Sequence, residues 1–236
     1  MAILTTTSEG FPELLPHGEA GQSLVLDVHV NALFAQRSYR YVKRAIDLAV
    51  ALSLLILVLP IMVAIALAVF LDSGGPVLFR QARVGKFGRP FEMLKFRTMR
   101  AERRCLNDGP PNGLVDRRQR HKSVADPRVT RFGRFLRRTC LDELPQLWNV
   151  LRGDMSMVGP RPELPSIVDR YEPWQHQRHL VAPGITGWWQ INRTADQLMH
   201  ESTELDIYYV EHHSLGLDLR ILAATVGAVI DGRGAY

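Results

Sequence analysis

Two adjacent carboxylates, Asp142 and Glu143, are the residues of this sequence best suited to chemistry on a phosphate. Apolar residues recur at helical spacing around them, at Leu141, Leu144, Leu147, Trp148 and Leu151. The spacing predicts a helix near residues 140–152 with both acids in its first turn. Because the N-terminal end of a helix favours negative charge, a carboxylate there should stay ionised. An ionised carboxylate can attack phosphorus, although most acids at such positions are only helix caps.

The ends of this helix are marked by residues that commonly bound helices. Thr139 stands three residues before Asp142, which is a capping-box pattern with Asp in place of the usual Glu or Gln. Pro145 falls in the first turns, where proline costs least, and Gly153 is a natural stop. The catalytic interpretation requires the Asp142 side chain to be charged, unhindered and directed toward nearby cations.

Arginines flank the two acids on both sides. Three precede them, at Arg134, Arg137 and Arg138. Arg161 follows them between two prolines, which fix their own backbone angles and stiffen the loop. Guanidinium groups match the geometry of phosphate oxygens, so these residues are candidates for phosphate binding. The alternative is that they cover anionic lipid headgroups.

Composition and charge narrow the classes of partner. The chain has 236 residues, of which 46% are hydrophobic, so a folded core is expected. Residues 80–138 carry a net excess of 13 positive charges, whereas residues 139–236 carry a net excess of 6 negative charges. The basic block suggests an anionic partner, either nucleic acid, anionic lipid or nucleotide phosphates. Two cysteines are too few for a disulfide framework and match no zinc spacing.

A hydrophobic segment dominates the first third of the chain. From Leu48 to Leu71 every residue except Ser53 is apolar, and Pro60 lies near the middle of these 24 residues. The length alone is typical of a transmembrane helix. However, proline kinks a helix, and each arm of about 17 Å is too short to cross about 30 Å of hydrocarbon.

The flanking charges favour a segment that enters and leaves the membrane on one face. Lys43 and Arg44 precede the segment, and a series of cations from Arg80 onward follows it. Positively charged flanks stay on the cytoplasmic side. If both ends obey that rule, the segment dips into the membrane and returns at Pro60, so re-entry is preferred over spanning.

The remaining elements are expected to form a small α+β domain. Short strands around residues 77–79 and 91–94 predict a β-hairpin, and residues 105–127 read as a surface loop. Helices are expected at residues 131–138, 165–180, 199–212 and 217–230. The final apolar run, Ile221 to Ile230, is too short to span a membrane and either packs on the core or lies in the interface.

Six ordered motifs over residues 40–236 resemble the bacterial sugar transferase family, the monotopic phosphoglycosyl transferases. They are Lys43-Arg44-x-x-Asp47 with the proline-broken helix, Lys95-Phe96-Arg97-Thr98-Met99, Leu141-Asp142-Glu143-Leu144-Pro145-Gln146, Pro160-Arg161-Pro162, Pro183-Gly184-Ile185-Thr186-Gly187 and Gly232-Arg233-Gly234-Ala235-Tyr236. The chain is similar to the minimal catalytic form of that family. It departs from the pattern at Leu59, where the family often has serine, and over residues 191–195.

The resemblance implies a phosphotransferase that moves a sugar-1-phosphate from a nucleotide sugar, by family habit a UDP-sugar, to undecaprenyl phosphate. This is the first membrane step of exopolysaccharide or glycoconjugate assembly. Asp142 would form a covalent phospho-sugar intermediate, and Glu143 would help to place Mg²⁺. Phosphates would be bound at the basic motif positions, which are Lys95, Arg97, Arg137 and Arg161.

The resulting prediction is an α-rich α+β protein with a membrane-embedded monotopic domain. It comprises an N-terminal extension (1–40), a re-entrant helix broken at Pro60 (41–75) and a catalytic domain with a small β-hairpin (76–236). The protein would lie on the cytoplasmic face of the bacterial inner membrane, in contact with membrane lipid and without nucleic acid. The sequence leaves the sugar and the oligomeric state open, with a homodimer as one option. The competing hypothesis is a non-catalytic, membrane-tethered basic module that binds anionic lipid or nucleic acid.

Overall fold

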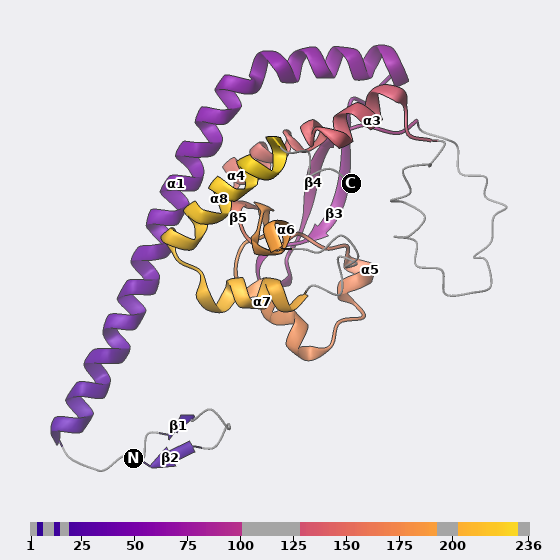
Figure 1. Cartoon of the computed structure of the whole chain (residues 1–236). Helices are drawn as coiled ribbons and strands as arrows, with labels where there is room; N and C mark the ends of the chain where they lie inside the picture. The colour runs from indigo at the N-terminus through magenta and orange to yellow at the C-terminus, as the bar shows by residue number, and fades with distance from the viewer. Residues whose placement is uncertain (1–3, 7–11, 15–18, 101–127, 193–202, 231–236) are drawn as a thin grey trace. The chain divides into compact units, whose positions relative to one another are not determined.

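The computed structural model describes residues 4–6, 12–14, 19–100, 128–192 and 203–230 (Figure 1). Its contacts divide the chain into two units, Met1–Lys43 and Arg44–Tyr236. The second unit carries every residue that the sequence nominated for the site. The predicted loop at 105–127 and most of the unusual segment 191–195 lie outside the described residues.

The first unit contains a short antiparallel pair, β1 (Leu4–Thr6) and β2 (Pro12–Leu14), followed by the start of helix α1. Helix α1 runs from Glu19 to Ser73 and therefore begins well before the apolar segment. Within it, Ser38–Ser73 is long and apolar enough to cross a membrane. Only 11% of its most apolar window is buried inside the protein, unlike the core helix of a soluble domain.

Helix α1 stays helical through Pro60 and bends in its C-terminal part (Figure 1). A proline inside a helix removes one hydrogen bond and clashes with the preceding turn, which is a common cause of a bend. The structure therefore shows a curved, continuous helix and not an interruption at Pro60. Re-entry into the same face of a membrane stays a prediction.

The segments of α1 before and after Pro60 pack against two different hydrophobic clusters. Before the proline, Ala51 is fully buried with Val150, Met157 and Tyr209 in the larger cluster. After it, Ile65 and Val69 are buried with Phe96 and Leu136 in the smaller cluster. Both arms of the helix are therefore held by one domain.

The predicted β-hairpin is confirmed and is longer than expected. Strands β3 (Leu78–Val84) and β4 (Pro90–Phe96) pair antiparallel, and a short 3-10 helix, η1 (Lys86–Gly88), joins them. Phe87 in this turn has a φ of 57°, a left-handed conformation that closes the tight connection. The hairpin sets the direction of the side chains on β4, including Lys95.

Helices after the hairpin match the predictions in part. Helix α3 (Arg131–Arg138) has the predicted bounds, and helix α4 (Gln146–Arg152) ends at Gly153 with a φ of 93°, as expected for a C-terminal glycine. The predicted helix at 165–180 is wrong. It is a short helix, α5 (Pro165–Val168), and a separate 3-10 helix, η3 (Pro173–Leu180), because the residue before Pro173 is extended.

The C-terminal part completes the core. Strands β5 (Ser156–Val158) and β6 (Gly184–Thr186) pair parallel, and helix α6 (Trp188–Asn192) follows. Helices α7 (Thr203–His212) and α8 (Leu215–Ile230) follow, close to the bounds predicted for them. Ile221 of α8 is fully buried in the larger cluster, so part of the final apolar run packs on the core, whereas Val226 is exposed.

Candidate active site

The two acids lie in their own 3-10 turn, η2 (Leu141–Glu143), and not in the first turn of α4 as predicted. The physical reason is Pro145, which directly precedes Gln146 and suits the start of a helix because it has no N–H to leave unpaired. The predicted capping box is also wrong. Cys140 precedes the turn with a φ of 56°, and the Thr139 hydroxyl donates to the Phe135 carbonyl.

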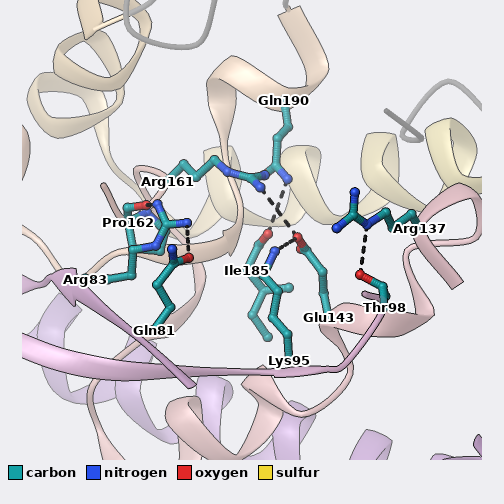
Figure 2. A network of polar contacts seen from close by, with 10 residues as sticks. All are labelled: Gln81, Arg83, Lys95, Thr98, Arg137, Glu143, Arg161, Pro162, Ile185 and Gln190. Atoms are coloured by element: carbon teal, nitrogen blue, oxygen red, sulfur yellow. Dashed lines mark hydrogen bonds and ion pairs between the residues drawn. The ribbon is translucent and has the colours of Figure 1, made fainter. Parts of the chain in front are cut away.

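Glu143 is bound by two cations from different parts of the chain (Figure 2). Lys95 Nζ lies 2.6 Å and Arg161 Nη2 lies 3.5 Å from Glu143 Oε1. Burial alone would raise the pKa of Glu143, but the charges of Lys95 and Arg161 outweigh it and lower the pKa to about 2. Glu143 is therefore a permanent anion at the centre of the site.

Asp142 has the opposite electrostatic balance. Burial, together with the neighbouring charge of Glu143, raises the pKa of Asp142 to about 6 against the opposing charges of Lys95, Arg137 and Arg161. The carboxyl group is still mostly ionised at neutral pH. The prediction of an unhindered side chain is wrong, since the residue is only 9% exposed. It is not completely enclosed, so the requirement of a reachable carboxylate is met in part.

Arg137 is placed beside the acids by the close approach of α3 to the strand end after β4. Its Nε donates to Thr98 Oγ1 over 2.9 Å (Figure 2). The Thr130 amide donates to the Thr98 carbonyl over 3.1 Å. A side chain at Gly133 would lie 2.1 Å from that carbonyl oxygen. Glycine at this position therefore allows the helix to bring Arg137 to the site.

Arg161 is placed by the packing of two predicted motifs. Gly159, just before it, lies against Gly184 of β6 so closely that a Cβ on Gly184 would meet the Gly159 nitrogen at 2.1 Å. The Arg161 guanidinium also lies 5.5 Å from the ring of Trp189, within cation–π range. The Gly159–Gly184 approach brings the Pro160-Arg161-Pro162 motif and the Pro183-Gly184-Ile185-Thr186-Gly187 motif together in the fold.

A second group of buried charges, here called the Arg178 cluster, comprises Arg178, Glu163, Asp206 and Tyr171. Arg178 pairs with Asp206, lies 3.9 Å from Glu163 and contacts the Tyr171 hydroxyl. It also donates to the Arg161 carbonyl over 2.8 Å. Sequence reasoning missed this cluster, because its members lie far apart along the chain and match no motif that we recognised. It supports the backbone of the loop that carries Arg161.

A small, open hollow borders the site and is lined by Arg83, Met93, Lys95, Glu143, Gln146, Arg161, Pro162, Gly184 and Ile185. Arg83 and Gln146 are functional candidates that the sequence prediction missed. Arg83 donates to the Pro162 carbonyl over 3.1 Å and to Gln81 over 2.7 Å (Figure 2). The alternation of side chains along a strand could have predicted Arg83. Gln81 pairs with Met93 and Arg83 pairs with Phe91, so these residues lie on one face of the hairpin.

Arg97 makes its described contacts away from the acids. Its Nη1 donates to the Gly75 carbonyl over 2.9 Å, just after helix α1. The structure thus brings together Lys95, Arg137 and Arg161 around Asp142 and Glu143, whereas a phosphate-binding role for Arg97 stays a prediction.

The acids offer a limited set of metal ligands. Among the described residues, no group of three or more His, Cys, Asp or Glu side chains is arranged to hold a metal. Mg²⁺ commonly binds one or two carboxylates and completes its shell with water and substrate phosphates. Asp142 and Glu143 fit that mode, with both described ion pairs of Glu143 made through Oε1.

Comparisons with known proteins show what the chain is similar to. A profile of the family described as bacterial sugar transferase matches residues 38–232, which include all the predicted site residues. The chain is 43% identical over 193 residues to the uncharacterized sugar transferase EpsL of Bacillus subtilis, covering 82% of this chain and 89% of that protein.

Two further relatives carry names that state a reaction. A UDP-glucose:undecaprenyl-phosphate glucose-1-phosphate transferase of Caulobacter vibrioides is 43% identical over 202 residues, covering 82% of this chain and 72% of the relative. A UDP-galactose-lipid carrier transferase of Erwinia amylovora is 39% identical over 216 residues, covering 90% of this chain. The chain spans only 45% of the length of that Erwinia protein.

Proposed function

Because this chain belongs to the bacterial sugar transferase family, as its sequence motifs predicted, we propose that it transfers a sugar-1-phosphate from a UDP-sugar to undecaprenyl phosphate. The observation that carries this proposal is the position of Asp142, a carboxylate ionised at neutral pH beside three cations. The names of two relatives, which include UDP-glucose, UDP-galactose, a lipid carrier and undecaprenyl phosphate, agree with these substrates.

In the first step, an Asp142 carboxylate oxygen attacks the β-phosphorus of the UDP-sugar. The bond between this phosphorus and the oxygen that bridges the two phosphates breaks, and UMP leaves with the bonding electrons. The sugar phosphate remains on Asp142 as an acyl phosphate. Lys95, Arg137 and Arg161, whose charges act on Asp142, would neutralise the phosphate charge, which is the main requirement of in-line phosphoryl transfer.

In the second step, a phosphate oxygen of undecaprenyl phosphate attacks the same phosphorus. The bond to Asp142 breaks, the carboxylate is regenerated, and the lipid carries a diphosphate-linked sugar. Because both displacements pass through one carboxylate, the enzyme would show ping-pong kinetics. A raised pKa suits this role, since a carboxylate of pKa near 6 is a stronger nucleophile than one of pKa near 4, and it is still ionised at pH 7.

We propose Mg²⁺ as the cofactor, held by Glu143 and Asp142 together with substrate phosphates. The ion would supply positive charge to the phosphate oxygens. Glu143 is suited to this role because Lys95 and Arg161 keep it ionised at all physiological pH values.

The membrane arrangement is proposed as re-entrant, with the catalytic domain on the cytoplasmic face of the inner membrane. The support is that both arms of α1, around Ala51 and around Ile65, pack on the same domain. A helix that spanned the bilayer would carry its two ends to opposite faces. The oligomeric state is open, with a homodimer as one option.

The competing basic-module hypothesis fits the structure less well. Lys95 and Arg161 both pair with Glu143 in a partly enclosed site, whereas a non-specific anion binder would present its cations on an open face.

The test is a panel of UDP-sugars, UDP-glucose, UDP-galactose and UDP-N-acetylgalactosamine, each with undecaprenyl phosphate and Mg²⁺, in which UMP release and lipid product are measured. We expect UMP to be released mainly from one preferred UDP-sugar of the panel. Salt-sensitive binding of DNA or anionic lipid, without UMP release from any donor, would overturn the proposal in favour of the basic module.

A further inference from the structure

Arg44 and Asp47, at the start of the apolar segment, make specific contacts that membrane topology does not explain. The positive-inside rule accounts for Arg44 only as a charge and gives no role to Asp47. In a helix, residues three apart lie on the same face, so both side chains can reach the same neighbouring elements. The structure shows which elements they reach.

Arg44 binds the C-terminal end of α4. Its Nη1 donates to the Val150 carbonyl over 2.7 Å, and its Nη2 donates to the Leu151 carbonyl over 3.0 Å. The last carbonyls of a helix have no partner within the helix, and positive charge is favourable there.

Asp47 binds strand β5 through both carboxylate oxygens. Its Oδ2 accepts from Ser156 Oγ over 2.7 Å, and its Oδ1 accepts from the Met157 amide over 3.1 Å. The side chain is buried, with the residue 5% exposed. A buried carboxylate with two donors is held firmly, because losing either donor leaves a desolvated charge unpaired.

The elements bound in this way are those that carry the candidate site. Helix α4 begins three residues after the end of η2, the turn of Asp142 and Glu143. Strand β5 ends one residue before Gly159, which leads to Arg161. Arg44 and Asp47 therefore connect the beginning of the membrane helix to both halves of the site.

We propose that Arg44 and Asp47 form a clamp that fixes the spacing between the Asp142–Glu143 turn and Arg161 by tying both supports to the membrane helix. Both are positioning residues, and through the clamp the geometry of the site depends on how α1 packs against the domain. This inference rests on the proposed function for its activity readout. Its structural readout, the protection of backbone amides, is independent of any reaction.

The test compares Arg44→Gln with Arg44→Lys and with Arg40→Gln, which removes the same charge one helical turn earlier. Each protein is reconstituted in lipid nanodiscs with UDP-glucose or UDP-galactose, whichever the wild type turns over, and undecaprenyl phosphate. Because a displacement of 1 Å in a site can cost about 100-fold, we expect Arg44→Gln to lower the kcat of UMP release at least about tenfold, with a smaller change in KM. Arg44→Lys should recover part of the loss, and Arg40→Gln should match the wild type.

Hydrogen exchange of the same proteins provides the second readout. We expect Arg44→Gln, but not Arg40→Gln, to speed amide exchange in residues 141–152 and 156–161. Asp47→Ala should do the same, while Asp47→Asn, which keeps one acceptor oxygen, should do so less. Cysteine labelling at the two ends of the apolar segment should show equal insertion of all variants.

Two outcomes would overturn the clamp. One is that Arg44→Gln keeps the kcat and the amide exchange rates of the wild type. The other is that Arg40→Gln loses as much kcat as Arg44→Gln, in proportion to the fraction of protein inserted in the membrane, as a role of charge alone requires. If the wild type releases no UMP from any donor, the proposed function fails, and the exchange data alone then decide the clamp.

Discussion

Arg161 joins two groups of buried charges that differ in what they leave available for a substrate. Its guanidinium contacts Glu143 in the first group, which also contains Lys95 and Asp142, and its backbone carbonyl accepts from Arg178 of the Arg178 cluster. In the Arg178 cluster the ion-paired side chains are only 2% to 5% exposed and pair with one another. In the first group, the side chains of Lys95, Glu143 and Arg161 keep 15% to 17% exposure and border a hollow.

The comparison shows that burial of charge does not by itself mark an active site. A charge that neutralises a phosphate must remain reachable, whereas a charge that holds a loop is best enclosed with its partner. Burial raises the pKa of both Asp142 and Asp206 to about 6, so these values do not separate the two groups. The hollow and the residual exposure do separate them.

Removing the nucleophile should have the largest effect. Asp142→Asn is expected to reduce UMP release by at least about 10³-fold, as loss of a nucleophile does in other enzymes. The raised pKa means that ionised Asp142 destabilises the folded state, a cost that appears as pH rises above the unfolded value of 3.8. Asp142→Asn should therefore increase the free energy of unfolding at pH 8 by up to about 3 kcal/mol.

Asp169 is exposed, so Asp169→Asn serves as the matched control and should change neither UMP release nor stability. Retained turnover in Asp142→Asn would remove the catalytic assignment. If Asp142→Asn is folded, inactive and more stable, the contrast with Arg178 becomes stronger, because loss of the Arg178 charge should destabilise the fold.

Removing the neighbouring acid should have a smaller effect on activity and the opposite effect on stability. The pKa of Glu143 is lowered to about 2, so its charge stabilises the fold above pH 4.5, and this stability is lost as pH falls toward 2. Glu143→Gln should reduce stability at pH 7 by about 3 kcal/mol. It should also raise the Mg²⁺ concentration needed for half-maximal UMP release, and unchanged metal dependence would exclude Glu143 as a ligand.

Conservative lysine substitutions test the division between the two groups. Arg161→Lys is expected to lower kcat/KM by about 10- to 100-fold with little change in melting temperature, because a lysine offers no planar fork to a phosphate. Arg178→Lys should lower stability by about 3 kcal/mol, since it leaves buried acids poorly paired. Folded Arg178→Lys protein should lose less activity than Arg161→Lys, and the reverse order would contradict the comparison.

The dependence of activity on pH should be the smallest of these effects. Because Asp142 acts as an anion and its pKa is about 6, kcat/KM should fall by about tenfold for each pH unit below 6. Glu143→Gln removes a charge that raises this pKa, so the inflection should move to lower pH. A profile that is flat between pH 5 and 8 would show that Asp142 does not titrate in the reaction.

The sequence was most informative where a property depends on neighbours along the chain. The apolar run, helix α3 and the hairpin follow from local periodicity, and the structure confirms them. The helix expected at 165–180 failed because Pro173 and its extended predecessor outweigh the apolar spacing. The helix expected from residue 140 failed similarly, since Pro145 separates the acids from α4.

The site could be predicted only through its motifs. Spacing alone could not indicate that Lys95 on β4 meets Glu143, 48 residues later, nor that Arg137 reaches Thr98. The Arg178 cluster depends on contacts between distant segments, so no local pattern revealed it. The sign of the pKa shift at Asp142 was also unpredictable, because it follows from burial that only the folded chain creates.

The most direct test is to mix the protein with UDP-glucose or UDP-galactose and Mg²⁺, without undecaprenyl phosphate, and to measure UMP and the intact mass of the protein. The account predicts up to one equivalent of UMP and a mass increase of one sugar phosphate, located on the peptide that carries Asp142 and absent in Asp142→Asn. If undecaprenyl phosphate, when added, is glycosylated while no adduct forms and the reaction requires both substrates together, direct transfer is correct and the covalent role of Asp142 is wrong.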